Sequence, residues 1–152
     1  MKFYPSILPI YSILPLIPAL LYHIPGTALL IDFDRIPGGA PTTRPDFLLL
    51  LDLALDAADA VQPPSTTIPS STHCLARKPQ WQLSASANDF LRLSYADLIL
   101  VLIAMRQKAE IVGYGECSVD IWVRTAPDRE FEVGLVSILR EDEGSKGNWT
   151  VS

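Results

Sequence analysis

The clearest pattern of apolar and polar positions lies between residues 94 and 113. Ser94 precedes the stretch YADLILVLIAMRQKAEIV, Asp97 follows three residues after that serine, and Gly113 ends the stretch. A serine before a helix, an acidic residue three positions on and a glycine after the last turn predict a helix over residues 95–112. One face of this helix would be apolar, formed by Leu98, Val101, Leu102, Met105, Ala109 and Val112. We expect that stripe to cover a sheet.

Three segments around this helix show the period-two alternation of half-buried strands. The first is WQLS at residues 81–84, and the second is CSVDIWVR at residues 117–124. In the second, the odd-numbered residues from Cys117 to Val123 face one way and Ser118, Asp120, Trp122 and Arg124 face the other. A turn at residues 126–129 and the stretch FEVGLVSIL at residues 131–139 complete a predicted hairpin, with Gly134 as a bulge site.

These elements predict an α+β domain over residues 74–140. Its order would be strand, helix, strand, strand, with one central helix packed on an antiparallel or mixed sheet. Residues 141–152 are polar and form a predicted tail.

The region before Cys74 is predicted to be organised separately. Residues 46–61 lack internal proline and glycine and are rich in Leu and Ala, which predicts a short helix with Asp46 as its N-cap. Residues 62–73 are rich in Pro, Ser and Thr, which is typical of a linker. Together with an extended lead-in from residue 29, they make up residues 29–73.

Residues 1–28 have the features of a secretory signal peptide. Lys2 supplies the positive start, residues 3–22 are mostly apolar, and Gly26, Thr27 and Ala28 are small residues suited to a cleavage site. We expect cleavage after Ala28 and an extracellular protein. Two alternatives remain open: an uncleaved membrane anchor, which the prolines in the segment disfavour, and a chain that is not exported.

Two further features agree with export. Cys74 and Cys117 are the only cysteines and are predicted to form a disulfide, although two free buried thiols would explain them as well. Asn148 begins the sequon Asn-Trp-Thr and is a predicted glycosylation site.

Charge and motifs narrow the range of functions. The 152 residues include 12 basic and 17 acidic ones, a net charge of -5 with no basic cluster, so we expect no nucleic-acid partner. The chain contains no G-x-S-x-G, H-E-x-x-H or Walker sequence, and adjacent His73 and Cys74 would point apart in an extended chain. We therefore expect no catalytic residue, metal or cofactor.

One exposed patch is predicted on the second strand. Trp122 lies there between Asp120 and Arg124, on the side opposite the central helix. An aromatic ring flanked by charges is suited to contact with a protein or glycan partner. Cross-strand packing, or cover by the N-terminal segment, would explain Trp122 equally well.

Residues 74–139 resemble a loose group of small secreted proteins of filamentous fungi. The resemblance rests on Cys74 before the strand that bears Trp81, on SYADLI, on GYGECSVDIWV and on EVGLVSI. It implies a leader, a Pro/Ser/Thr-rich middle and two cysteines, and it brings no catalytic residue because the group has no assigned activity. The expected function is that of a small secreted, non-catalytic, effector-like binding protein. A domain held at a surface by its uncleaved N-terminus and, more remotely, a small hydrolase built on acidic residues are the alternatives.

Overall fold

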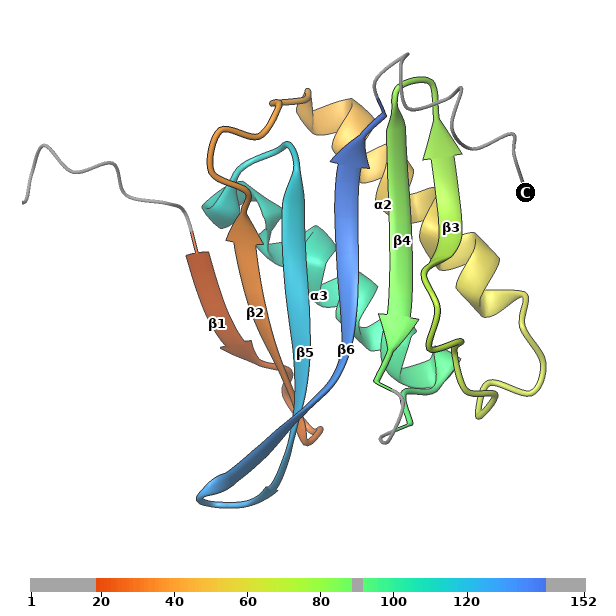
Figure 1. Cartoon of the computed structure of the whole chain (residues 1–152), viewed down its shortest axis with the longest axis vertical. Coiled ribbons are helices and arrows are strands. Elements are labelled where there is room, and N and C mark those ends of the chain that lie inside the picture. The colour runs from red at the N-terminus through yellow and green to blue at the C-terminus, as the bar shows by residue number, and fades with distance from the viewer. Residues whose placement is uncertain (1–18, 89–91, 142–152) are drawn as a thin grey trace, which may run out of the picture.

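Six strands form one antiparallel sheet, and two helices pack on it (Figure 1). The structure is a computed structural model in which residues 19–88 and 92–141 are described. In chain order the elements are β1 (Ala19–His23), β2 (Leu29–Arg35), α2 (Arg44–Asp59), β3 (His73–Lys78), β4 (Trp81–Ala87), α3 (Tyr95–Val112), β5 (Cys117–Ala126) and β6 (Arg129–Arg140). The fold is therefore α+β, as expected from the sequence.

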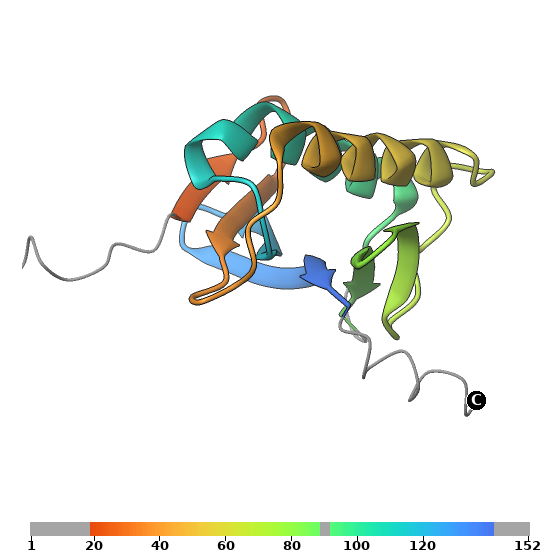
Figure 2. The same cartoon turned by 90° about the horizontal axis from the view of Figure 1, so that it is seen from above.

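The sheet is built from three hairpins. The strand order is β1-β2-β5-β6-β4-β3, so the hairpin made last in the chain occupies the centre and the first two hairpins flank it. Both helices lie on the same side of the sheet, as the view from above shows (Figure 2). Within residues 19–88 and 92–141, no helix lies on the other face of the sheet.

The core lies between the helices and the sheet. Alternate residues of β2 and β5, among them Ile31, Phe33 and Val119, are fully buried on the helix side. The six residues predicted to form the apolar face of the central helix are all buried in α3. The alternation predicted for β5 is confirmed, because Cys117, Val119 and Ile121 are buried while Ser118, Asp120 and Trp122 are only partly so.

The central helix matches its prediction from end to end. α3 spans Tyr95–Val112, with Ser94 as N-cap and Gly113 as C-cap. The backbone N–H of Asp97 donates to Ser94 Oγ at 3.1 Å, and the N–H of Ser94 donates to the Asp97 carboxylate at 3.5 Å. This reciprocal pair satisfies two N–H groups that the first turn would leave without partners.

A second helix covers the same face, which corrects the expectation of a single central one. α2 begins at Arg44, not at Asp46, and its N-cap is Thr43, whose Oγ accepts from the N–H of Asp46 at 3.3 Å. Pro45 fits in the first turn, because the N–H that proline lacks has no helical partner there. Asp52 of α2 pairs with Arg106 of α3 at 2.8 Å. Neither described helix is long and apolar enough to cross a membrane.

The N-terminal region differs most from expectation. Residues 29–35, predicted as an extended lead-in, form β2, which pairs with β5 and β1 in the sheet. The alternation of Leu29, Ile31 and Phe33 with two aspartates is the strand signal, and the glycines and prolines after it concealed it. Residues 19–23, predicted as part of the leader, form β1.

The predicted boundary between residues 29–73 and the domain that begins at Cys74 does not separate two cores in the structure. The segment between α2 and β3 contains Ile68, which is only 3% exposed and belongs to the main core. Thr67 forms a bridge with Ser94 at the start of α3. The Pro/Ser/Thr-rich segment is thus packed against the domain, and the residues on both sides of it share one core.

A chain that starts at Leu29 is expected to be less stable than one that starts at Ala19. It would lose β1, in which Leu20 and Tyr22 pack against the core and the Tyr22 ring lies 4.6 Å from the Lys108 ammonium. Loss of two partly buried side chains should lower the free energy of unfolding by about 3 kcal/mol. Urea denaturation of the two chains measures the difference, and equal midpoints would show that β1 contributes nothing to stability.

Candidate functional site

The sheet face turned away from the helices is not covered by any described helix. Three rows of registered residues cross it. The middle row is formed by Leu21, Asp32, Asp120, Leu135 and Ser86. The row on one side of it is formed by Ala19, Asp34, Ser118, Ser137, Ser84 and Cys74. The row on the other side is formed by His23, Leu30, Trp122 and Glu132.

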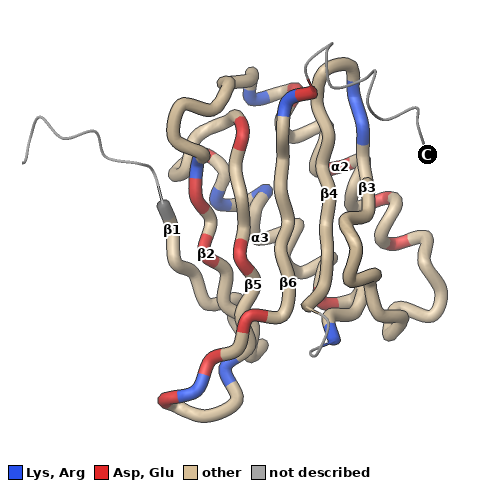
Figure 3. Tube along the Cα trace, in the orientation of Figure 1, with Lys and Arg blue, Asp and Glu red and all other residues tan. Residues whose placement is uncertain are grey.

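Four carboxylates gather on this face at β2, β5 and β6. Asp32 and Asp120 are directly opposite each other across the strand pair, Asp34 follows Asp32 on the same side of β2, and Glu132 lies on β6. We call these four residues the acidic surface. Figure 3 shows acidic positions along β2, β5 and β6, whereas β3 carries basic ones. Like charges directly opposite each other in a sheet destabilise it, so this arrangement has an energetic cost.

Burial and mutual repulsion raise the pKa values of three of these carboxyl groups. The pKa of Asp120 is raised, first by burial and then by the charge of Asp32. The pKa of Glu132 is raised by burial and by the charge of Asp120. The pKa of Asp34 is raised by burial, by the charge of Asp32 and a hydrogen bond to it, and by the charge of Asp120. A cation that approaches this surface would therefore stabilise the charged forms of Asp34, Asp120 and Glu132.

None of the four carboxylates has a cationic partner among the described residues. The ion pairs there join Arg77 with Glu141, Arg106 with Asp52, and Arg124 with Glu130. Asp34 Oδ1 is buried and has no hydrogen-bond partner. Within the same residues, no three acidic, histidine or cysteine groups converge closely enough to hold a metal ion. The acidic surface therefore presents its charges in rows, without a coordination centre.

The predicted patch around Trp122 is only partly assembled. Asp120 belongs to the acidic surface, but the Arg124 guanidinium is engaged by Glu130 at 2.8 Å across the β5 and β6 hairpin. Trp122 is partly buried, and its registered neighbour Leu30 is only 4% exposed although it lies outside the helix-facing core. The indole thus lies beside an apolar residue of the neighbouring strand, which agrees with the cross-strand packing that the sequence analysis gave as the alternative explanation for Trp122.

The predicted disulfide between Cys74 and Cys117 is not present, and the topology opposes it. Both thiols are free; Cys74 is exposed on β3 and Cys117 is buried on β5. Two strands, β4 and β6, lie between them. Three strand spacings put the two Cα atoms roughly 14 Å apart, beyond the limit of about 7 Å for a disulfide. Burial raises the pKa of the Cys117 thiol to about 12, so it stays protonated.

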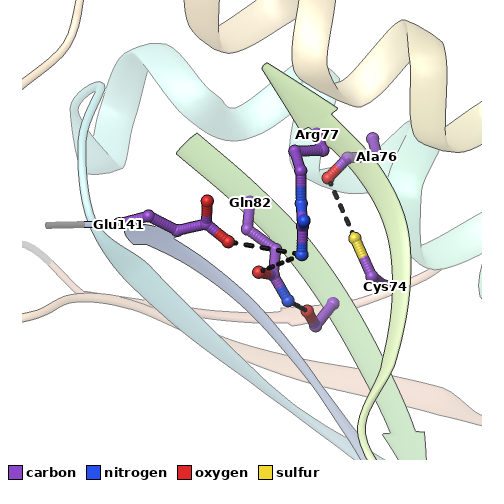
Figure 4. Close-up of polar contacts among 6 residues, drawn as sticks. Cys74, Ala76, Arg77, Gln82 and Glu141 are labelled. Atoms are coloured by element: carbon purple, nitrogen blue, oxygen red, sulfur yellow. Dashed lines mark hydrogen bonds and ion pairs between the residues drawn. The ribbon is translucent and has the colours of Figure 1, made fainter. Parts of the chain in front are cut away.

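Cys74 instead belongs to a polar edge of the open face. Its thiol lies 3.6 Å from the carbonyl oxygen of Ala76, beside a bulge in β3 (Figure 4). Nearby, Arg77 donates to Gln82 at 3.1 Å and pairs with Glu141 at 3.3 Å, and Gln82 donates to Ser84 at 2.7 Å. These contacts join β3, β4 and the end of β6, which is a structural role.

Sequence reasoning missed three of the four acidic residues. Asp32 and Asp34 lay in the predicted lead-in, and Glu132 was treated only as part of a return strand. Their common signal was alternation with apolar residues, which puts them on the same side as Asp120 once the strands are paired. The predicted glycosylation residue, Asn148, lies outside the described residues.

Asp120→Asn is expected to stabilise the protein at pH 7. Because the pKa of Asp120 is raised in the folded state, its contribution to stability is fully present below its ordinary pKa of 3.8 and is lost as pH rises through the raised value. The asparagine should recover about 0.5 kcal/mol at pH 7, a modest figure because solvent screens this partly exposed group, and nothing at pH 3. Urea denaturation at both pH values checks this, with Asp128→Asn at the exposed hairpin tip as control. An equal gain at both pH values would contradict the electrostatic cause.

Comparison of the chain with protein-family models, with curated protein sequences and with solved structures finds no match to any of the three. The functional argument therefore rests on the side chains of the described residues. Among these, the four carboxylates of the acidic surface lie on neighbouring strands and belong to none of the ion pairs.

Proposed function

We propose that this chain is a non-catalytic binding protein that docks a cationic segment of a protein partner on its acidic surface. One observation carries the proposal: Asp32 and Asp120 face each other on an uncovered sheet face, with Asp34 and Glu132 beside them. The pKa values of Asp34, Asp120 and Glu132 are raised, and none of the four carboxylates has a cationic partner among the described residues, so the isolated protein leaves this electrostatic cost unrelieved. A cationic partner would relieve it.

The spacing favours an extended segment with basic residues at alternate positions. Asp32 and Asp34 are two residues apart on one strand, so their Cα atoms are separated by about 7 Å, while their carboxyl groups lie within hydrogen-bonding reach of each other. Alternate Cα atoms of an extended peptide have the same separation. A Lys or Arg pair at that spacing can therefore contact both carboxylates, while the ladder-related Asp120 adds a third charge.

The geometry favours binding over hydrolysis. The acidic surface lies on an open sheet face, and the cavity beside it, about 260 Å³ in volume, is lined by only one of the four carboxylates, Glu132. Hydrolysis by a carboxylate pair needs both groups placed around the same bond of a substrate that is held in a concave site. The same open face suits contact with a second macromolecule.

We further propose that the protein acts outside the cell, as an effector-like protein similar to the fungal group named above. The apolar N-terminal segment supports export, and the alternative is a domain held at a membrane by that segment. Because β1 begins at Ala19, a mature protein that keeps the whole sheet has to start at or before that residue. This moves the expected cleavage upstream of Ala28.

An extended peptide with lysine at alternate positions, KSKSKSKSK, is expected to bind the full chain, with affinity that falls steeply between 20 mM and 500 mM salt, because the Debye length drops from roughly 20 Å to about 4 Å. Replacement of both Asp32 and Asp120 by asparagine should weaken binding at least tenfold. Fluorescence anisotropy of the labelled peptide measures this.

The matched control for this binding experiment is Asp56→Asn. Asp56 is exposed on α2, on the helix side of the sheet. Its replacement by asparagine removes one negative charge, as Asp120→Asn does, but leaves the acidic surface unchanged. If Asp56→Asn weakened peptide binding as much as Asp120→Asn alone, net charge would explain the affinity and the site assignment would be wrong.

Expression of the full chain in a secreting eukaryotic host tests the proposed location. We expect protein in the medium whose first residue lies at or before Ala19, and whose Cys74 is alkylated without prior reduction because its thiol is free and exposed. Intact mass measurement before and after alkylation gives both results. Recovery only in the membrane fraction with Met1 retained would support the anchored alternative.

A further inference from the structure

Two hollows share Trp81, the first residue of β4, in their lining. The turn that leads into β4 lies at the end of the sheet opposite the tip of the β5 and β6 hairpin (Figure 1). The larger, about 450 Å³, is lined by Pro41, Thr42, Thr43, Gln80, Trp81 and Arg140. The smaller, about 270 Å³, is lined by Asp46, Leu50, Lys78, Pro79 and Trp81. The larger volume is within the range of small-molecule sites, about 300 to 1,000 Å³.

Two basic residues flank Trp81 in the sheet. Trp81 of β4 is registered with Lys78 of β3 on one side and with Arg140 of β6 on the other. Trp81 lies two residues before Leu83, which is fully buried on the helix side, so its indole lies on that side of the sheet too. The site is therefore on the opposite face from the acidic surface and is independent of it.

The Arg140 guanidinium is available to a ligand. Among the ion pairs of residues 19–88 and 92–141, none includes Arg140. Its Nη2 lies 3.5 Å from Gln80 Oε1, and only its backbone N–H is engaged by a carboxylate, that of Glu116, at 3.2 Å. A planar guanidinium without an ionic partner is suited to donate two parallel hydrogen bonds to a carboxylate.

Gln80 adopts a backbone conformation that its side chain disfavours. Its φ is +71°, the only positive φ of a described residue other than glycine. It occupies the turn between β3 and β4 directly after Pro79, where glycine or asparagine is the favoured residue for this conformation. The glutamine side chain therefore costs stability, and it lines the larger hollow beside Arg140. Local backbone strain of this kind is typical of ligand-contacting positions.

We propose that the hollow at Trp81 binds an acidic sugar, a pyranose ring that bears a carboxylate, such as a uronic acid unit. The indole offers a flat apolar surface to the ring, Arg140 pairs with the carboxylate, and Thr42 and the Gln80 amide contact ring hydroxyls. Thr42 and Gln80 would have no hydrogen-bonding role with a purely aromatic acid, which is why the polar lining favours the sugar.

Titration of the ¹⁵N-labelled full chain with trigalacturonic acid tests the site. The indole N–H resonance of Trp81 is identified by its loss in Trp81→Phe. We expect saturable shifts of this resonance and of the Gln80 and Arg140 amides, with Trp122 unaffected. Maltotriose, which lacks the carboxylates, and benzoate, which lacks the hydroxyls, should each bind at least tenfold more weakly.

Arg140→Gln should weaken trigalacturonate binding at least tenfold. Its control is Arg124→Gln, which removes an exposed arginine on the distant hairpin and should leave binding unchanged. The backbone contact of residue 140 with Glu116 remains in the glutamine variant, so the fold is expected to persist. Thr42→Val supplies a second test, because the Thr42 N–H bond to the carbonyl oxygen of Tyr114 does not depend on the side chain.

Gln80→Gly separates a ligand-binding role from a structural one. Glycine relieves the positive φ, so the urea midpoint should rise, while trigalacturonate affinity should fall at least threefold. If the role of Gln80 were purely structural, the affinity for trigalacturonate would not fall when the fold becomes more stable.

Three results would each overturn the proposal: no shift of the Trp81 resonance, equal affinity of Arg140→Gln and the unchanged protein, or tighter binding of benzoate or maltotriose than of trigalacturonate. All these outcomes are independent of peptide binding to the acidic surface.

Discussion

Burial on one side only is the constraint on which the rest of this structure depends. α2 and α3 cover a single face of the six-stranded sheet, so the strands bury apolar residues on that side, while the uncovered side carries polar residues together with Leu21, Leu30 and Leu135. In β2 and β5 this alternation puts aspartates on the uncovered face, and antiparallel pairing brings Asp32 opposite Asp120. The charge cluster thus follows from the same alternation that builds the core.

A network of partly buried hydrogen bonds at the end of the sheet secures the connections between these elements. The Glu116 carboxylate accepts from the N–H of Ala40 at 2.8 Å and from that of Arg140 at 3.2 Å, while Arg35 Nε donates to its carbonyl oxygen at 3.1 Å. Gly115, at φ +158°, leaves room for Arg35, because a Cβ there would lie 2.4 Å from the guanidinium. One residue therefore ties the loop after β2 to the ends of β5 and β6.

Local signals were sufficient to predict α3 and the last hairpin. Ser94, Asp97 and Gly113 define the helix ends through contacts within four residues, and the alternation in β5 is visible in the sequence itself. β1 and β2 could not be recognised in the same way. The residues of β1 resemble a leader when read alone, the glycines and prolines after β2 conceal its alternation, and the pairing of β2 with β1 and β5 identifies both as strands.

The candidate sites differ in how far the sequence could reveal them. Asp120 and Trp122 could be placed on the uncovered face from alternation, but Asp32 joins them only through a pairing between residues 88 positions apart. The prediction of a disulfide between Cys74 and Cys117 was wrong for the same reason. The strand order, which is unknown from the sequence, separates the two cysteines by β4 and β6. Spacing along the chain carries little information on distances across a sheet.

The two candidate sites share an energetic feature although their chemistry is opposite. At the acidic surface, like charges without partners destabilise the sheet, and at Trp81 a glutamine occupies a turn position suited to glycine. Residues that destabilise the fold are expected mainly at binding sites, because elsewhere in the chain the residue types agree with the local structure. The two candidate sites lie on opposite faces of one sheet, so a cationic protein segment and an acidic sugar could be held at the same time without contact between them.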